Sequence, residues 1–332
     1  MRLYLLLLLC CFLLVLPSCS RKEAGEGSEK PAVAVIPKGM THQFWKSVHA
    51  GAMKAAAELD VEIIWKGPFK EDDRESQIKV VEDLVTRGVA GIVLAPLDNA
   101  ALRVPVLNAA RSGIPVAIID SHLQGEDYIS YIATDNFAAG KKAARRLAEL
   151  LAGKGKIVML RCMEGSASTM EREEGFLEEM KAFPGIEIAS SNQYGGATTE
   201  SAYQASENLL APFTDAGGVL TLNGIFCPNE STTFGMLRAL QDGGHAGKVF
   251  YVGFDSSDKL IQALAQGEIH GLVIQDPFQM GYLGVQSIMQ FLHGQEVVKK
   301  VDTGSVVATR ENMENPDVAR LLKPDLKQWL NE

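Results

Sequence analysis

The sequence has few of the residues that build metal sites, disulfide frameworks or nucleic-acid surfaces. Only five of its 332 residues are cysteines, and none of them has the C-x-x-C spacing of zinc or redox motifs. The six histidines are scattered, without an H-x-x-x-H or H-E-x-x-H arrangement, so no metal site is expected. The formal net charge is −9 and there is no long basic run, which argues against a nucleic-acid partner.

Motifs of common enzymes are also missing. The segment 165–168 (GSAS) is not the G-x-S-x-G turn of serine hydrolases, and no glycine-rich loop ends in the Lys-Ser or Lys-Thr of a phosphate-binding loop. We therefore predict no catalytic residue and no cofactor.

One long apolar segment, residues 3–16, lies near the start of the chain. It is short for a bilayer span and has the length of a signal-peptide core. It ends in Leu16-Pro17-Ser18-Cys19, which resembles the lipobox of bacterial lipoproteins, where the chain is cut before the cysteine and the cysteine is acylated. The resemblance implies a signal peptide at 1–18, a lipid anchor on Cys19, and a location in the periplasm or at the cell surface. The alternative is a short transmembrane anchor with an incidental cysteine.

Residues 19–30 are polar and contain glycine, with no large apolar side chain. Such a segment cannot bury enough surface to offset its ordering entropy, so we interpret it as a flexible tether. The chain from residue 31 onward is long enough for two domains of ordinary size.

This body alternates short apolar runs with segments of helical periodicity, such as the stripe formed by Phe44, Val48, Ala52, Ala55 and Leu59. The pattern predicts an α/β fold with two doubly wound parallel-sheet lobes, whose ligand site is the cleft between them, outside the carboxyl ends of the strands. The predicted strands are 32–36, 61–65, 91–95, 114–119 and 129–132 in the first half, and 156–160, 186–188, 218–222, 249–252 and 271–274 in the second.

Two of these strands stop at an aspartate, Asp120 in the first half and Asp255 in the second. Either residue alone could simply cap the next helix. Because they occupy matching positions in two similar halves, we favour a role facing a ligand in the cleft. Paired carboxylates could also suggest a glycosidase, which assays of turnover on glycosides would distinguish from a binding protein.

Short motifs follow one another in a specific order along the body: HQFW at 42–45, LAPLDN at 94–99, IIDS at 118–121, YIATDN at 131–136, EREEGF at 171–176, CPNE at 227–230, GFD at 253–255 and IQDP at 274–277. In order and spacing they resemble the periplasmic binding proteins of the ribose and galactose type, the type I substrate-binding proteins of ABC importers. The resemblance covers residues 32 to about 309.

The resemblance implies a monomer that captures a monosaccharide without altering it and delivers it to a membrane permease. It implies a first lobe of residues 31–135 and 276–302, and a second lobe of 136–275 and 303–332, joined by a three-strand hinge. The resemblance implies ligand contacts from His42, Phe44, Trp45, Asp120, Arg172, Asn229, Asp255 and Gln275. Two further ligand-binding positions, where this chain departs from the family, are Lys38 and Ser121.

The chemistry of these residues suits a sugar, which has an apolar C–H face and a rim of hydroxyl groups. Trp45 and Phe44 can supply a flat wall, the aspartates accept hydrogen bonds from hydroxyls, and Arg172 offers a planar set of donors. Phe44 begins the helical stripe, so it could equally be a core residue.

The chain departs from the ribose-type pattern at three positions. Ser121 stands where the pattern has arginine, Ala95 where it has asparagine, and Lys38 where it has a small polar residue. Together, Lys38 and Ser121 could move one positive charge across the site while keeping the charge balance. Alternatively, Lys38 is a solvated loop residue. The sugar itself stays open among pentoses, hexoses and polyols.

Two further functions compete with import. A regulator of the lactose-repressor family shares the expected fold but carries an amino-terminal helix-turn-helix, where this chain has an apolar segment. A sugar-sensing adaptor for a membrane receptor or histidine kinase would use the same closed surface, and neighbouring genes would distinguish it. Finally, Cys162 and Cys227 could form a disulfide between adjacent strands or stay buried as free thiols, and we favour the thiols.

Overall fold

The computed structural model describes residues 30–330. The predicted signal peptide, Cys19 and residues 19–29 of the predicted tether lie outside the described residues. Within residues 30–330, no helix is both long and apolar enough to cross a membrane.

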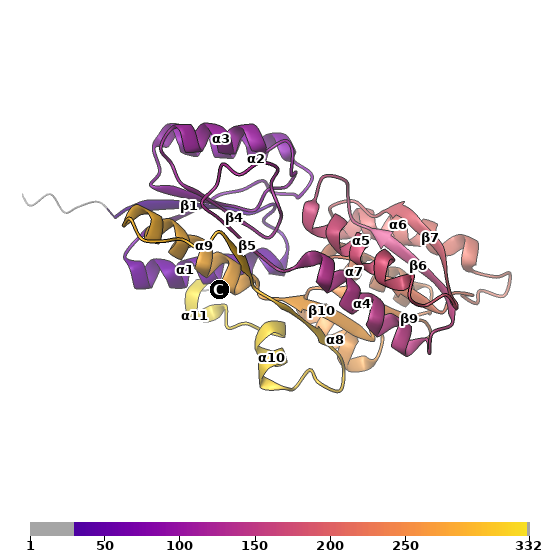
Figure 1. Cartoon of the computed structure of the whole chain (residues 1–332). Coiled ribbons are helices and arrows are strands. Elements are labelled where there is room, and N and C mark those ends of the chain that lie inside the picture. The colour runs from indigo at the N-terminus through magenta and orange to yellow at the C-terminus, as the bar shows by residue number, and fades with distance from the viewer. Residues whose placement is uncertain (1–29, 331–332) are drawn as a thin grey trace, which may run out of the picture. The chain divides into compact units, whose positions relative to one another are not determined.

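The first sheet contains six strands, and every pair of neighbouring strands is parallel. Its strands are β1 (Ala32–Ile36), β2 (Glu62–Trp65), β3 (Gly91–Leu94), β4 (Val116–Ile119), β5 (Ser130–Ala133) and β11 (Lys300–Asp302). They are arranged in the order β11-β5-β4-β3-β1-β2. Helices α1 (Gln43–Leu59), α2 (Arg74–Arg87), α3 (Arg103–Arg111) and α9 (Pro277–Leu292) cover its two faces (Figure 1).

Alternating side chains explain why this sheet is covered on both sides. Val33 and Val35 pack in one core with α1 and α9, whereas Ala34 and Ile36 pack in another with α2 and α3. Because neighbouring residues of a strand point to opposite faces, a run that is apolar at every position needs helices on both. We call this sheet and its helices the first lobe.

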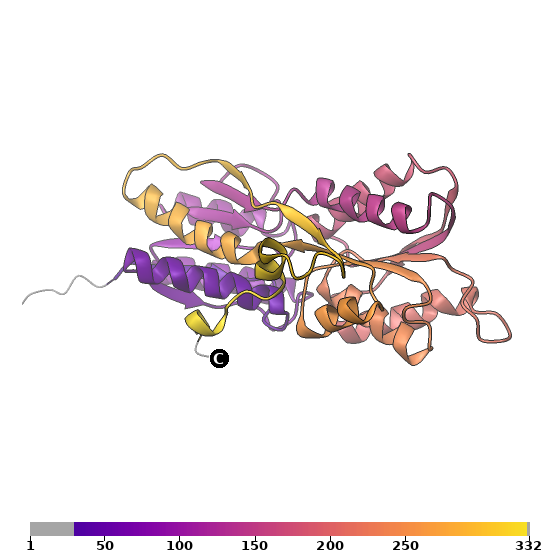
Figure 2. The ribbon, with the colours of Figure 1, turned by 90° about the horizontal axis from the view of Figure 1, so that it is seen from below.

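The second lobe repeats this architecture. Its sheet contains β6 (Gly155–Arg161), β7 (Ile186–Tyr194), β8 (Gly224–Phe226), β9 (Phe250–Phe254), β10 (Gly271–Gln275) and β12 (Ser305–Ala308), in the order β12-β10-β9-β8-β6-β7. Only the edge strand β12 is antiparallel to its neighbour. Helices α4 (Asn136–Leu150) and α5 (Ala167–Met180) pack on one face, and α6 (Thr199–Leu210), α7 (Glu230–Asp242) and α8 (Asp258–Gln266) on the other (Figure 2).

The expected fold class is therefore confirmed, as two doubly wound α/β lobes. The chain passes between the sheets from β5 to α4, from β10 to α9, and from β11 to β12. These crossings bring the carboxyl ends of the strands of both sheets to the space between the lobes, where ligands of such folds bind.

One predicted strand is wrong. Residues 218–222 form no strand; the strand of this region is β8, at Gly224–Phe226. Gly218 has a left-handed backbone (φ 76°), and Asp215 accepts hydrogen bonds from the backbone of Gly217 and Val219. The predicted run therefore begins in a turn and Val219 is 61% exposed, whereas Leu220 pairs with Thr214 in a single antiparallel bridge and Leu222 is buried in the second-lobe core.

The C-terminal tail differs from its expected place in the second lobe. Helix α10 (Pro316–Leu322) does pack there, with Val318 and Leu322 in the core. Helix α11 (Lys327–Leu330), however, packs against α1 of the first lobe. The tail thus contacts both lobes beside the hinge, because the chain between Leu322 and Lys327 leads away from the second lobe.

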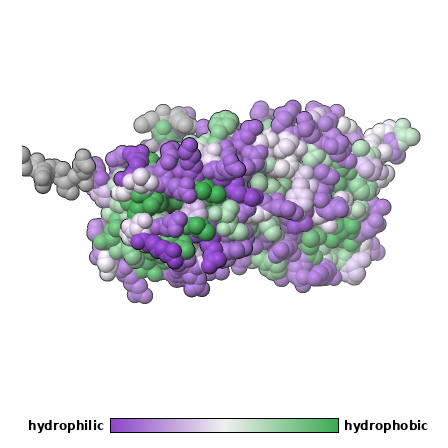
Figure 3. Space-filling view, turned by 90° about the horizontal axis from the view of Figure 1, so that it is seen from above, coloured by the Kyte–Doolittle hydropathy of each residue, from purple (hydrophilic) through white to green (hydrophobic). Residues whose placement is uncertain are grey.

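The molecular surface is mostly polar on the face that Figure 3 shows, with apolar residues in separate patches. Large exposed apolar side chains, such as Phe69, Val104 and Val298, belong to different segments of the first lobe. Single exposed apolar residues of this kind are normal for a folded protein.

Candidate functional site

The two strand-end aspartates line one buried cavity between the lobes. Asp120 follows β4 and Asp255 follows β9, and both have left-handed backbones, with φ of 62° and 65°. Aspartate tolerates this conformation better than most residues. Both carboxylates face the interlobe cleft from equivalent positions of two similar sheets.

The structure brings together every predicted ligand-binding residue except Ser121 at the wall of this cavity. Ser121 lies directly behind the wall, where its hydroxyl is hydrogen bonded to Lys38. The cavity is lined by Lys38, His42, Phe44, Trp45, Glu71, Asp120, Ser166, Ser168, Thr169, Arg172, Asn229, Glu230, Asp255 and Gln275.

Lys38 is part of the cleft and not a solvated loop residue, so that alternative is wrong: only 4% of it is exposed. Its ammonium group lies 2.7 Å from the Asp120 carboxylate and 2.6 Å from the Ser121 hydroxyl, both in the first lobe. It also donates across the cleft to the hydroxyls of Ser168 (3.0 Å) and Ser166 (3.3 Å). Lys38 therefore supplies, from another segment of the chain, a positive charge beside Ser121, where the family pattern has arginine.

A second ion pair lies close by in the first lobe. His42 Nδ1 and Trp45 Nε1 both lie 2.6 Å from the same carboxylate oxygen of Glu71. Burial by itself would lower the pKa of His42, but the Glu71 carboxylate raises it to about 9. Burial would likewise raise the pKa of Glu71, but His42 lowers it to about 2. At neutral pH the pair is a buried imidazolium and carboxylate.

The aromatic residues serve both the cavity and the core. The rings of Phe44 and Trp45 meet edge to face, with centroids 4.8 Å apart and planes at 83°. Both rings line the cavity, and both belong to the core beneath α1. The two interpretations of Phe44 are therefore compatible, and the indole of Trp45 is fixed in addition by its bond to Glu71.

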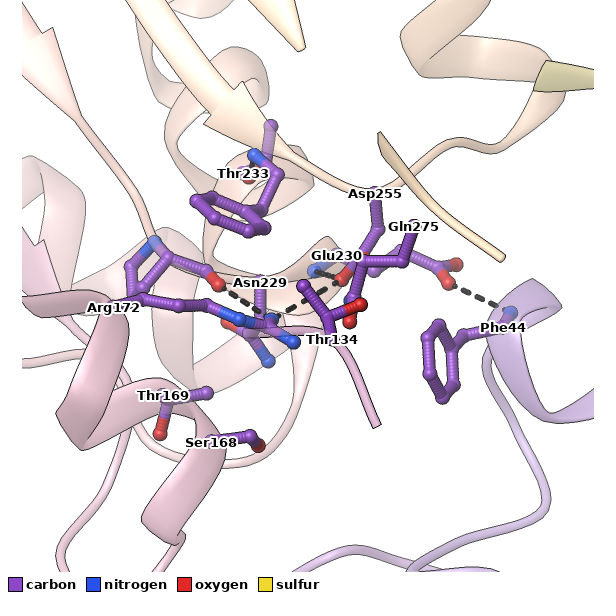
Figure 4. A network of polar contacts seen from close by, with 12 residues as sticks. Phe44, Thr134, Ser168, Thr169, Arg172, Asn229, Glu230, Thr233, Asp255 and Gln275 are labelled. Carbon is purple, nitrogen blue, oxygen red and sulfur yellow. Dashed lines mark hydrogen bonds and ion pairs between the residues drawn. The ribbon is translucent and has the colours of Figure 1, made fainter. Parts of the chain in front are cut away.

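Arg172 is the central donor of the second lobe. Its guanidinium donates to the Asn136 side-chain oxygen and to the Pro228 carbonyl, both at 2.9 Å, and lies 3.9 Å from Asp255. It also lies over the Phe254 ring, 4.6 Å from the centroid. Figure 4 shows this side chain reaching toward Asp255.

The backbone that carries Arg172 is held by a close contact between helices α4 and α5. A Cβ atom added to Gly140 would lie 2.1 Å from the Arg172 carbonyl oxygen, which is a severe overlap. Only glycine allows this approach, so Gly140 helps to set where the guanidinium lies.

Asp255 and Gln275 form the floor of the cavity on the second-lobe side. Asp255 accepts hydrogen bonds from the Gln275 side-chain amide (2.6 Å) and from the Glu230 backbone (3.0 Å). Burial raises the pKa of Asp255, although Arg172 opposes the shift. The side-chain oxygen of Gln275 is buried and has no hydrogen-bond partner among the described residues, so it is available to a ligand hydroxyl.

Asn229 has a structural role beside its place at the cavity. It is the N-cap of α7, where its side-chain oxygen accepts from the backbone of Thr232, and its amide donates to Ser231. The side-chain oxygen and one N–H of the Asn229 amide are therefore already hydrogen bonded within the protein.

The sequence analysis missed Glu71, Ser166, Ser168, Thr169 and Glu230. Glu230 directly follows Asn229 in the CPNE motif, so the motif itself contained the signal. Ser166 and Ser168 belong to the GSAS segment, which was tested only as an enzyme motif. Nothing in the charged run around Glu71 distinguishes this carboxylate from its neighbours.

The lobes are closed over the cavity. Besides the contacts of Lys38, the backbone of Asn99 donates to the Gly165 carbonyl across the cleft at 3.1 Å. The remaining space is about 30 Å³, room for about two water molecules. This space is too small for a ligand of monosaccharide size while the lobes are closed.

A larger cavity, of about 570 Å³, lies between the tail and the hinge. Its lining includes Lys54, Asp276, Arg320 and Trp329, and Arg320 is already paired with Asp276 at 3.0 Å. The cleft is the better candidate site, because the strand ends of both sheets and most of the buried polar side chains converge there.

Cys162 and Cys227 are both buried as free thiols, so the structure contains no bridge between them. Cys162 lies near the Gly196 carbonyl (3.8 Å), whereas Cys227 belongs to the core that also contains residues of α6 and α7. Among residues 30–330, no three histidine, cysteine or carboxylate side chains are grouped as metal ligands would be.

Comparison with known proteins agrees with this geometry. The family model described as a periplasmic binding protein domain matches residues 33–296. The ribose import binding protein RbsB of Haemophilus influenzae is 28% identical over 278 residues, which cover 84% of this chain and 91% of the relative. The D-allose-binding periplasmic protein of Escherichia coli is 27% identical over 262 residues, covering 76% and 82%.

Solved structures show the same fold. A carbohydrate-transporter solute-binding protein of Agrobacterium radiobacter, in complex with D-arabinose, has a TM-score of 0.83 and 31% identity, covering 89% of this chain and 99% of that one. A solute-binding protein of Agrobacterium vitis with bound D-fucose has a TM-score of 0.83 and 34% identity, covering 88% and 100%. These relatives are solute-binding proteins of sugar transport and not enzymes, as predicted. The chain belongs to the periplasmic binding protein family and has the type I fold of its sugar-binding members.

Proposed function

We propose that this protein captures a single monosaccharide in the interlobe cleft and delivers it to the permease of an ABC importer. The observation that carries the proposal is the pair of strand-end aspartates, Asp120 and Asp255, which face one buried cavity together with Arg172. Carboxylates accept from neighbouring hydroxyls and a guanidinium donates to them, which is the complement of a sugar rim. Relatives named for ribose, D-allose, D-arabinose and D-fucose support the sugar class.

The lobes open and close about the proposed hinge. One lobe consists of residues 31–135 and 276–302, and the other of residues 136–275 and 303–322, with α11 of the tail packed on the first lobe. The direct ligand contacts are proposed to come from His42, Phe44, Trp45, Asp120, Arg172, Asn229, Asp255 and Gln275, with Lys38 and Ser121 replacing the arginine of the ribose-type pattern.

A thermal-shift and calorimetric screen over pentoses, hexoses and polyols tests the function. A ligand present at a hundred times its Kd adds about 2.7 kcal/mol of stability. We expect one monosaccharide to stabilise the folded protein and to be recovered unaltered. The sugar assignment fails if no sugar or polyol stabilises the protein while an amino acid or a nucleoside does.

We also propose that acylated Cys19 holds the protein at a membrane. The Cys19→Ser variant should appear in the soluble fraction or accumulate as uncleaved precursor, and uptake of the identified sugar should fall. Processed Cys19→Ser protein that still sediments with salt-washed membranes would overturn the anchor.

A further inference from the structure

The charges of the residues that line the cleft do not sum to zero. Its lining contains four carboxylates and three cationic side chains. Three carboxylates each have a cationic partner: Glu71 lies 2.6 Å from His42, Asp120 lies 2.7 Å from Lys38, and Asp255 lies 3.9 Å from Arg172. The fourth carboxylate is Glu230.

Glu230 is held across the cleft by backbone groups. It lies at the start of α7 in the second lobe, and its two oxygens accept from the backbone N–H groups of Gln43 and Phe44, both at 3.2 Å, at the start of α1 in the first lobe. Figure 4 shows the contact with Phe44. The donors and the acceptor belong to different lobes, so this arrangement exists only when the lobes are closed.

Glu230 has no cationic partner of its own, because the backbone N–H groups at the start of α1 favour its ionised form without supplying a full positive charge. His42 faces it from the first lobe but is already paired with Glu71. Asp255 faces it from the end of β9 and repels it, and Arg172 lies beyond Asp255. Closure therefore encloses one more negative charge than positive, which is costly in a cavity with little water.

We propose that Glu230 is the surplus carboxylate of the cleft, so that ligand capture is favoured by a positive charge that enters with closure. The charge is a proton from solvent when the ligand is an uncharged monosaccharide, and an ammonium group when the ligand is an amino sugar. This inference rests on the proposed function and deepens it, because it makes Glu230 a residue that determines specificity.

The direction in which ligand affinity depends on pH follows from the closure of the lobes. Burial in the closed cleft raises the pKa of Glu230 from the ordinary 4.5 to about 7, against the attraction of His42. The open protein exposes the carboxylate to water, so closure takes up a proton between these two values. The resulting gain in affinity for an uncharged sugar is complete below about pH 4.5 and is lost as the pH rises through about 7.

The ion pairs formed within one lobe differ from Glu230 in where their partners lie. His42 and Glu71 both belong to the first lobe, and Asp255 and Arg172 both belong to the second. These pairs persist when the lobes separate, whereas the contacts of Glu230 with α1 do not.

Calorimetry in buffers of different ionisation enthalpy, phosphate and Tris at pH 7, tests the proposal. The uncharged ligands are D-ribose, D-allose, D-arabinose and D-fucose, and the amino sugars are D-glucosamine and D-galactosamine. For an uncharged sugar that binds, we expect uptake of about half a proton per site at pH 7 and an affinity that falls about tenfold from pH 6 to pH 8. An amino sugar should bind with much smaller uptake.

The variant Glu230→Gln should remove both the proton uptake and the pH dependence, and should weaken the binding of an amino sugar that the parent protein binds. The matched control Glu82→Gln, on the exposed surface of α2, should behave as the parent protein. If Glu230→Gln does not fold, the parent protein still tests the proposal, because an uncharged sugar that binds without proton uptake overturns it.

The possible results are distinguishable. An uncharged sugar that binds without proton uptake, or uptake that survives in Glu230→Gln, overturns the proposal and leaves the proposed function intact. Proton uptake with uncharged sugars combined with no binding of either amino sugar overturns the ammonium source alone. If no sugar of either kind binds, the proposed function fails, and this inference fails with it.

Discussion

The strand-end aspartates of the two lobes share a backbone conformation but differ in how their charge is balanced. Asp120 and Asp255 both follow a buried strand and both have left-handed backbones. Asp120 lies 2.7 Å from the Lys38 ammonium. Asp255 is 3.9 Å from Arg172 and relies on hydrogen bonds from Gln275 and from the Glu230 backbone.

The comparison extends to the whole cleft. In the first lobe, direct ion pairs (Glu71 with His42, and Asp120 with Lys38) balance the acids. In the second lobe, Asp255 and Glu230 depend mainly on amide donors. A buried ion pair is favourable only when its partners are close and fully hydrogen bonded. The repeated architecture therefore fixes where the acids lie, while the groups that stabilise them differ between the lobes, and those of Glu230 come from α1 of the first lobe.

The largest effect on ligand affinity should come from removing the Arg172 side chain in the second lobe. Arg172→Ala leaves the oxygens of Asn136 and Pro228 without a donor and Asp255 without a cation. We expect the affinity for the identified sugar to weaken by about 2–4 kcal/mol, measured by calorimetry. Arg145→Ala, a control whose side chain is 59% exposed, should bind as the parent does. Binding by Arg172→Ala as tight as that of the parent would refute this site assignment.

The first-lobe pair of His42 and Glu71 should make stability depend on pH. The pKa of His42 is raised to about 9, so its contribution is complete below about pH 6.5 and is lost as the pH rises through 9. The pKa of Glu71 is lowered to about 2, so its contribution is complete above about pH 4.5 and is lost as the pH falls through 2. Both contributions are thus complete between about pH 4.5 and 6.5.

Urea unfolding at pH 6.5 to 9.5 measures this effect. The parent protein should lose on the order of 2–3 kcal/mol of unfolding free energy through His42. His42→Gln should remove that part of the slope, whereas the control His293→Gln, at an exposed position, should keep it. The same slope in the parent and in His42→Gln would show that the pair does not stabilise the fold.

Double-mutant cycles should sharpen the contrast between the two aspartates. The cycle of Lys38→Met with Asp120→Asn should give a coupling free energy of about 1–3 kcal/mol in urea unfolding, because the two charges lie 2.7 Å apart. The cycle of Arg172→Ala with Asp255→Asn should give a smaller value, since that pair is 3.9 Å apart and Asp255 keeps its amide donors. Equal couplings would contradict the difference between the lobes.

The smallest effect concerns the thiols, which among the described residues occur only in the second lobe. Burial raises the pKa of Cys227 to about 12 and that of Cys162 still further from its usual range. We expect neither thiol to react with iodoacetamide in the folded protein. Mass spectrometry should show both alkylated after unfolding without reductant, and a peptide linked through Cys162 and Cys227 would contradict this.

Much of the fold could be predicted because its signals are local. The apolar run at 32–36 became β1, and the stripe from Phe44 to Leu59 became α1. The run at 218–222 misled because it begins in a turn at Gly217 and Gly218, and its Leu222 is buried in the core although it lies outside the strand, which starts at Gly224. Hydrophobicity alone does not distinguish a short buried strand from an irregular segment that buries single apolar side chains.

The sequence by itself determined the alternation of strands and helices, the two-lobe fold and the aspartates at matching strand ends. These features depend on the period of apolar residues and on the residue that follows each strand. Only the tertiary structure decided that Lys38 pairs with Asp120, that Glu71 turns inward to His42, and that Glu230 reaches across to α1. Such contacts join residues far apart in the chain, and their energies depend on distance and burial, which no local pattern records.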